Sequence, residues 1–179
     1  MWEHRLIEKI VPSIKEEIDK INKTGEIDAN YIETIVDFFK IYADKTHHGK
    51  EENILFEQLK QKKNLQDDHK RIMDELIQEH TTARYKVKQL IDLNNAYRKD
   101  KSQLDHIVTL LSELSSFYPK HIMKEDKHFF LPVMKYFTEE ERREMLKEFE
   151  KFDMAMIHWK YQQVVKVLTG VIVPIRYEP

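Results

Sequence analysis

Glycine is scarce in this chain, and its scarcity limits the possible folds more than any other feature of the sequence. Only 3 of the 179 residues are glycine, whereas globular proteins carry about 7%. The tight turns of a many-stranded β protein depend on glycine, because glycine adopts positive φ angles without strain. Hydrophobic residues make up 41% of the chain, which is enough for a buried core. We therefore expect a folded, mostly helical protein.

Apolar residues recur every three or four positions, the spacing of a helix that buries one face. This periodicity predicts helices over residues 2–21, from 28 or 30 to 59, over 66–97, over 102–137 and over 138–168. Pro12 is expected to kink or divide the first helix, and Pro119 and Pro132 to bend or end parts of the fourth. Four long helices with short connections predict an all-α, up-down-up-down four-helix bundle.

The fifth predicted helix is an addition to that bundle. Thr138 and Glu141 form a capping box at its start, and Gly170 is placed to stop it. The last residues, VIVPIRYEP, contain a proline that cannot continue the helix, so an extended tail is expected. We predict a single domain over residues 1–179, in which 1–136 form the bundle and 137–179 form a helix and tail that pack on it.

Composition excludes several kinds of site and partner. The absence of cysteine excludes disulfides, thiolate zinc sites and iron–sulfur clusters. A net charge of −2 provides no field that would attract nucleic acid or an anionic membrane. No apolar stretch approaches the ~20 residues that span a bilayer, and the opening MWEHRLIEKI is charged where a signal peptide would be apolar. The sequence therefore predicts a cytoplasmic protein that binds neither nucleic acid nor membrane.

Histidines fall where the helical pattern favours apolar residues. Each of the four bundle helices places one on its apolar face, and two helices add a glutamate four residues later, on the same face. These side chains are His4, His48, Glu52, His80, His121 and Glu125. Burying imidazoles and carboxylates is costly unless they are paired or bound to metal. We predict that they bind two divalent metal ions, and this donor set favours iron or manganese over copper(I).

Two further pairings compete with this set. His47 and Glu51 have the same four-residue spacing as His48 and Glu52. Adjacent residues of an α-helix point about 100° apart, so only one of the two neighbouring histidines is expected to face the core. His128, one turn after Glu125, is a candidate for an extra ligand.

Four segments of the chain resemble the ligand motifs of the hemerythrin-like, or HHE cation-binding, domain family. In chain order they are EHRLIEKI, HHGKEENILF, LIQEHTTARY and HIMKEDKHFFLP. They cover roughly residues 1–136, and their common order makes the resemblance specific as a set. The resemblance implies metal ligation by His4, His48, Glu52, His80, His121 and Glu125, with Arg84 supporting the site from behind the ligands. It also implies two iron ions joined by Glu52, Glu125 and an oxo, hydroxo or water bridge, with zinc or manganese as other possible metals.

The sequence departs from the pattern of oxygen-carrying hemerythrins in two places. Those proteins have two histidines one turn apart on the third helix, whereas Leu76 and Arg84 flank His80 here. They also have an aspartate five residues after the fourth-helix histidine. Here Asp126 holds that position and Glu125 precedes it, so either could bridge the metals. One histidine fewer would leave an open metal position, which favours reactivity or sensing over reversible oxygen storage.

The leading hypothesis is a non-haem di-iron protein that binds or senses dioxygen, nitric oxide or peroxide, in iron handling or the oxidative-stress response. One alternative is a helical interaction module whose metal site is structural or lost. Another is a ferritin-type di-iron oxidase, which needs Glu-x-x-His on two helices, whereas this chain has it once, at Glu125 and His128. The apolar face of the fifth helix could cover the bundle or form a homodimer contact.

Overall fold

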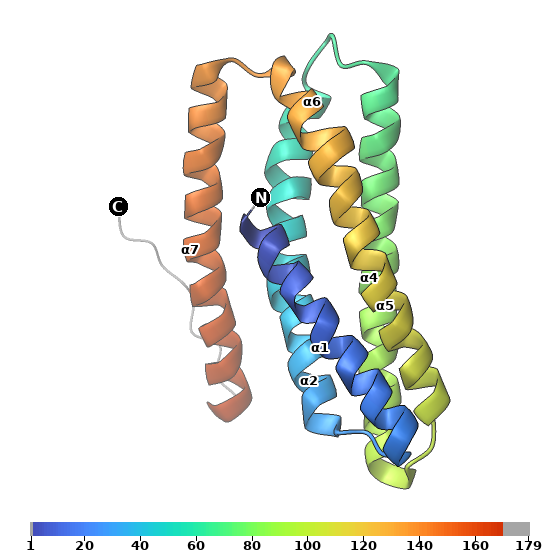
Figure 1. Ribbon diagram of the computed structural model, residues 1–179. Coiled ribbons are helices and arrows are strands. Elements are labelled where there is room, and N and C mark those ends of the chain that lie inside the picture. Colours follow the sequence, from blue (N-terminus) through green and yellow to red (C-terminus); the bar gives the residue numbers. More distant parts are fainter. Residues whose placement is uncertain (1, 170–179) are drawn as a thin grey trace.

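The computed structural model describes residues 2–169, which form five helical rods and contain no β-strand (Figure 1). The first, third and fifth rods are α1 (Trp2–Thr24), α4 (Asp67–Asp100) and α7 (Glu139–Thr169). The second joins α2 (Ala29–Asp37), the π-helical segments η1 (Phe38–His48) and η2 (Glu51–Phe56), and α3 (Glu57–Lys60). The fourth joins α5 (Leu104–Lys124), the π-helical η3 (Glu125–Phe130), α6 (Leu131–Val133) and the 3₁₀ turn η4 (Met134–Tyr136).

Consecutive rods run in opposite directions, and the first four enclose a common core. Helix α1 lies against α5, α5 against α4, and α4 against α2 (Figure 1). The predicted all-α, up-down-up-down bundle is therefore confirmed. Over residues 2–169, no helix is both long enough and apolar enough to cross a membrane.

The loop between α1 and α2 is built from one glycine and one capping aspartate. Gly25 has φ of +70° and donates its backbone N–H to the Ile21 carbonyl at 2.8 Å. Asp28 caps α2, because its carboxylate accepts hydrogen bonds from the backbone N–H groups of Asn30 at 3.0 Å and Tyr31 at 3.2 Å. Of the two predicted starts of the second helix, residue 28 is therefore the cap.

Proline does not divide the first helix. Pro12 lies inside a continuous α1, so the expected division is wrong, and Pro119 likewise lies inside α5. Proline removes a backbone hydrogen bond, but Val11 and Ile14 beside Pro12 are buried in the core. These buried contacts hold α1 together across the proline.

Helix α7 stands outside the bundle and packs along the second rod (Figure 1). Its predicted capping box is confirmed, since Thr138 N–H donates to Glu141 Oε2 at 2.9 Å and Glu141 N–H donates to Thr138 Oγ1 at 3.2 Å. Ion pairs join it to the second rod, Lys50–Asp153 and Asp37–Lys160, and to the loop that follows this rod, Lys62–Glu141. The predicted stop at Gly170 and the extended tail lie outside the described residues.

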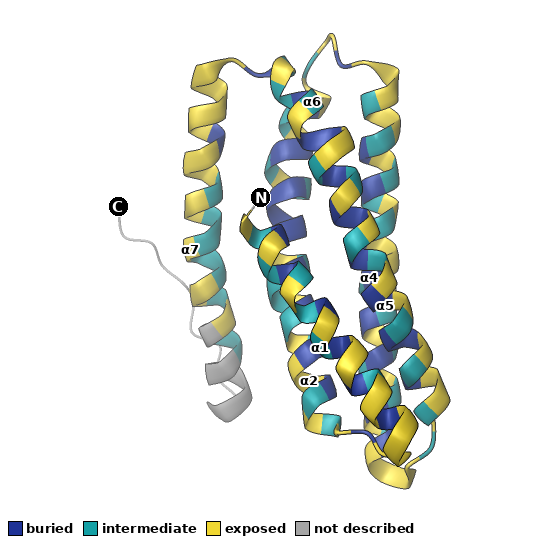
Figure 2. Cartoon of the chain, in the orientation of Figure 1, coloured by how far each residue is buried: buried dark blue, intermediate teal, exposed yellow. Residues whose placement is uncertain are grey.

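Buried residues lie on the inner faces of the bundle helices (Figure 2), and the apolar ones form two clusters stacked along the bundle axis. One cluster gathers the inner residues of α1, α2, the C-terminal half of α4 and most of α5. The other gathers η2, α3, the N-terminal part of α4, η3, α6 and Met145 of α7. On α4 the two clusters meet between Leu76 and Val87, and on α5–η3 between Ile122 and Phe129. Polar side chains occupy the layer between them.

Candidate metal centre

Seven buried polar side chains cross the bundle in this layer. They are five histidines and two glutamates, each at most 2% exposed: His4, His47, His48, Glu51, His80, His121 and Glu125. They come from all four rods of the bundle. Because the helices bury one face each, the same packing that forms the core forces these polar groups together.

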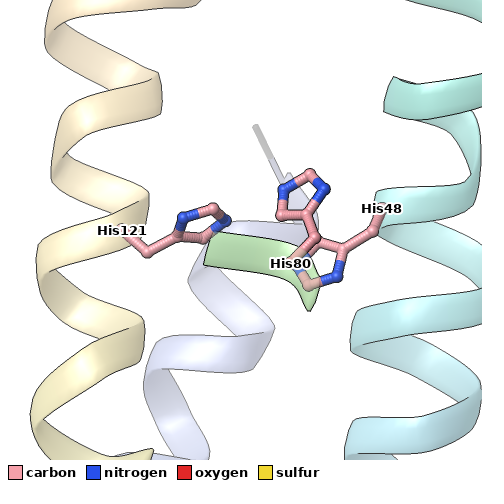
Figure 3. Close-up of side chains that lie close together, drawn as sticks. All are labelled: His48, His80 and His121. Atoms are coloured by element: carbon pink, nitrogen blue, oxygen red, sulfur yellow. The ribbon is translucent and has the colours of Figure 1, made fainter. Parts of the chain in front are cut away.

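Three of the histidines form one group, composed of His48, His80 and His121 (Figure 3). One ring nitrogen from each lies within 4.8 Å of the other two. The His48 and His80 rings stack with their centroids 3.8 Å apart, and His121 meets His80 edge-on at 5.0 Å. Three imidazoles from three different rods thus converge, as in a metal site.

The second group consists of His4, His47, Glu51 and Glu125, which offer donor atoms within 4.8 Å of one another. The Nε2 atoms of His4 and His47 are 3.0 Å apart. His4 Nε2 lies 3.1 Å from Glu125 Oε2, and His47 Nε2 lies 3.3 Å from Glu51 Oε1. Two imidazoles and two carboxylates therefore surround a second point.

Both glutamates reach from one group to the other. Glu51 directs Oε1 toward His47 and Oε2 toward His80, whose Nε2 is 3.4 Å away. Glu125 directs Oε2 toward His4 and Oε1 toward His121 and His80, at 3.1 Å and 3.5 Å. Each carboxylate thus has one oxygen for each group, which is the disposition of a bridging ligand.

Each of the five imidazoles has a carboxylate near Nδ1, the ring nitrogen that points away from the centre of the layer. Four Nδ1 atoms are within hydrogen-bond distance: His4–Asp126 at 2.8 Å, His47–Glu3 at 3.2 Å, His80–Glu52 at 2.7 Å and His121–Glu79 at 2.7 Å. The fifth, His48 Nδ1, is 3.5 Å from Asp44. A carboxylate at Nδ1 fixes the ring orientation and leaves Nε2 to bind metal.

The second rod turns both of its adjacent histidines inward, contrary to the expectation that only one would face the core. His47 and His48 are each 1% exposed. They end the π-helical segment η1, and a π turn holds more residues than an α turn. Neighbouring side chains are therefore separated by less than the 100° of an α-helix, and both reach the core. The Thr46 hydroxyl donates to the Ile41 carbonyl, five residues earlier, at 2.9 Å.

The same widening exchanges the glutamates. Glu51 is 1% exposed and lies in the layer, whereas Glu52 is 25% exposed and belongs to neither group. Glu52 accepts hydrogen bonds from His80 Nδ1 and from Arg84, the latter at 2.8 Å. Arg84 also donates to Asp44 at 2.7 Å. Arg84 therefore supports the site from behind, while Glu51 takes the position predicted for Glu52.

The doubled pair HHGKEE contains the signal for this exchange, since both histidines have an acid four residues later. The other uncertainty of the sequence concerned Glu125 and Asp126. Glu125 lies in the layer, and Asp126 accepts a hydrogen bond from His4 and pairs with Arg5.

The candidate His128 and two other side chains of the bundle, His69 and Tyr118, belong to neither group. His128 is exposed and belongs to neither group, so the single Glu-x-x-His pair does not converge on the layer. His69 Nδ1 is 2.7 Å from the Tyr136 hydroxyl, away from the layer. Tyr118 is buried and stacks on Phe39 with the ring centroids 4.5 Å apart.

Burial and neighbouring charged groups shift the pKa values of these side chains strongly. Burial and the neighbouring Glu125 raise the pKa of Glu51 well above its usual value. Burial would also raise the pKa of Glu125, but contacts with His121, His4 and His80 hold it well below its usual value. Burial and the adjacent His80 lower the pKa of His48. Burial opposes protonation of His121 as well, but Glu125 and Glu79 outweigh it and raise its pKa to about 9.

Many polar atoms in this layer have no hydrogen-bond partner among residues 2–169. They include both oxygens of Glu51 and of Glu125, both ring nitrogens of His48, and Nε2 of His80 and His121. Orphaned buried donors and acceptors are rare in folded proteins, because each costs about 1–3 kcal/mol. Metal cations placed among these nitrogens and oxygens would satisfy them, so the residues present fit a metal centre.

Comparison with known protein families agrees with this geometry. The chain matches the family described as hemerythrin HHE cation binding domain over residues 2–133. That span contains all seven side chains of the layer. No curated protein and no solved structure shows a significant match. The chain therefore belongs to the hemerythrin HHE cation-binding domain family.

Proposed function

We propose that the layer binds two metal ions, one in each group, with Glu51 and Glu125 bridging them. One observation carries this proposal, namely that each of these carboxylates points one oxygen at each group. Bridging carboxylates hold two cations close together and offset the repulsion between them.

The donor set favours iron or manganese over zinc. Counting each bridging carboxylate at both ions, the first ion would have four donors, from His4, His47 and the two glutamates. The second would have five, from His48, His80, His121 and the same glutamates. Structural zinc sites are almost always four-coordinate, whereas mixed imidazole and carboxylate ligands with higher coordination suit iron or manganese. Two iron ions would supply a redox-active site for dioxygen, nitric oxide or peroxide.

The protein's own residues prepare this site in two ways. The two apolar clusters above and below the layer exclude bulk water, which strengthens every electrostatic interaction inside it. The outer carboxylates hold the protons on Nδ1 and so keep the inner nitrogens free. Small-ligand binding is expected of a member of this family, and we propose a sensing or protective role in iron handling or oxidative stress.

Metal content tests the proposal directly. Protein loaded with ferrous iron under anaerobic conditions and then desalted should retain about two irons per chain by elemental analysis. His47→Ala should reduce that number, whereas His106→Ala, a change at an exposed histidine outside both groups, should not. Retention of no iron, or equal retention by both variants, would refute the dinuclear centre. Retention of one zinc ion alone would favour the structural-metal alternative.

A further inference from the structure

A pocket of about 920 Å³ lies between α1, the second rod and α7, outside the metal centre. Much of its lining is apolar, including Leu6, Phe38, Ile41, Met156 and Ile157. Ligand pockets for organic molecules have volumes of about 300–1,000 Å³ and combine apolar walls with a few polar groups. Helix α7 forms one wall, so the helix added to the bundle creates the pocket.

The charged groups around the pocket are paired with one another. Lys50 is 4% exposed and donates to Asp153 at 2.9 Å and to Glu3. Lys160 donates to Asp37 at 2.8 Å. Among the described residues of the lining, every lysine and every carboxylate has a partner of opposite charge, so none of these charges is unpaired. A neutral occupant therefore fits it better than an ion.

Two polar atoms of the described lining make no hydrogen bond, the Tyr42 hydroxyl and Asp153 Oδ1, and of these Asp153 Oδ1 lies 2.7 Å from Lys50 Nζ in an ion pair. The Tyr42 hydroxyl is buried and makes no hydrogen bond with any described residue. Burial, and after it the nearby carboxylates Glu3 and Asp153, raise its pKa to about 12. The hydroxyl thus remains protonated at neutral pH and lies near Glu3 and Asp153, both of which line the pocket. Its proton has no acceptor among the described residues, so a ligand oxygen that reached it would accept a hydrogen bond.

We propose that this pocket binds a neutral, largely apolar organic molecule with a carbonyl oxygen that accepts a hydrogen bond from Tyr42. Glu3 connects the pocket to the metal centre, because it lines the pocket and contacts both His47 and Lys50. An occupant would therefore contact the groups that orient a proposed metal ligand. Binding itself does not require metal.

The test compares two probes of nearly equal shape, menadione (2-methyl-1,4-naphthoquinone) and 2-methylnaphthalene, which lacks the carbonyls. Dissociation constants are measured by fluorescence quenching and by NMR titration, on metal-free and zinc-loaded protein. The chain has no cysteine, so quinone addition to a thiol cannot mimic binding. We expect menadione to bind more tightly than 2-methylnaphthalene. Tyr42→Phe should weaken menadione about five- to tenfold, the effect of one hydrogen bond, and leave 2-methylnaphthalene unchanged.

Two matched variants on α7 locate the site. Ile157 and Leu146 are 60% and 61% exposed, but only Ile157 lines the pocket. Ile157→Glu should abolish binding of both probes, and Leu146→Glu should leave it unchanged. Failure of menadione to bind, equal menadione affinity in Tyr42→Phe, or full binding by Ile157→Glu would overturn the proposal. Since binding is measured without metal, the result is independent of whether the dinuclear centre exists.

Discussion

Replacing Glu51 with glutamine should affect the metal-free and metal-loaded proteins in opposite directions. In the metal-free protein, Glu51 is buried beside Glu125, and neither of its oxygens makes a hydrogen bond with a described residue. Its pKa is raised well above the usual 4.5 by burial and by that neighbouring charge. A glutamine amide has nearly the shape of the protonated acid but needs no proton at neutral pH. The substitution should therefore stabilise the metal-free fold.

The size of this gain has a ceiling set by the cost of protonation. Holding a carboxyl with an ordinary pKa of 4.5 protonated at pH 7 costs about 3.4 kcal/mol, from about 2.5 pH units at 1.36 kcal/mol each. We expect Glu51→Gln to raise the free energy of unfolding of the metal-free protein by about 1–3 kcal/mol at pH 7. A raised pKa in the folded state reduces stability as pH rises above the unfolded-state value. The gain should therefore vanish as the pH falls to about 4.5.

With metal bound, the sign reverses. Glutamine cannot bridge two cations with two anionic oxygens, so metal affinity should fall at least a hundredfold. For two ions, each bound at least a hundredfold more weakly, this removes about 5.4 kcal/mol of ligand stabilisation at saturating metal, which exceeds the gain of about 1–3 kcal/mol in the metal-free fold. Urea unfolding at pH 7, with chelator and with excess metal, measures both effects.

Glu52→Gln is the matched control. Burial would raise the pKa of Glu52, but hydrogen bonds from His80 and Arg84 outweigh burial and lower it. Its removal should therefore destabilise the metal-free protein by about 1 kcal/mol, after allowance for its partial exposure. If both substitutions stabilised the metal-free protein equally, or if Glu51→Gln did not stabilise it, the placement of Glu51 in the layer would be contradicted.

Three further measurements test other parts of the structure. Metal binding at pH 7 should release protons, because the pKa of His121 is raised to about 9 and metal requires neutral imidazole. Calorimetry in buffers of different ionisation enthalpy should detect the released protons. The metal affinity should also rise from pH 7 to 9. A Cβ at Gly49 would lie 2.9 Å from Phe152 of α7, so Gly49→Ala should loosen α7 and speed its proteolysis. Adding Phe152→Ala to this variant should relieve the clash but should not restore the lost packing of the Phe152 ring. Thr138→Ala removes one half of the capping box with Glu141 and should cost about 1 kcal/mol; an unchanged urea midpoint would contradict that estimate.

The sequence alone was sufficient for the fold and for most of the buried histidines. Helical periodicity and scarce glycine are local properties, and each apolar face commits its helix to the core regardless of its neighbours. His4, His80, His121 and Glu125 interrupt those faces at regular α-helical spacing. Their burial therefore follows from the same pattern that buries Leu76 and its equivalents.

Tertiary structure decided which side chains of the second rod enter the layer. Sequence spacing assumes an α-helix, and under that assumption His47 and His48 exclude each other. The π-helical turns of η1 and η2 change the register, so that Glu51 replaces Glu52 inside the bundle. Such turns lack the regular hydrogen bonds of an α-helix, and they persist only where packing contacts compensate for that loss. That balance depends on the facing residues of α1, α4 and η3, which no local pattern in the second rod contains.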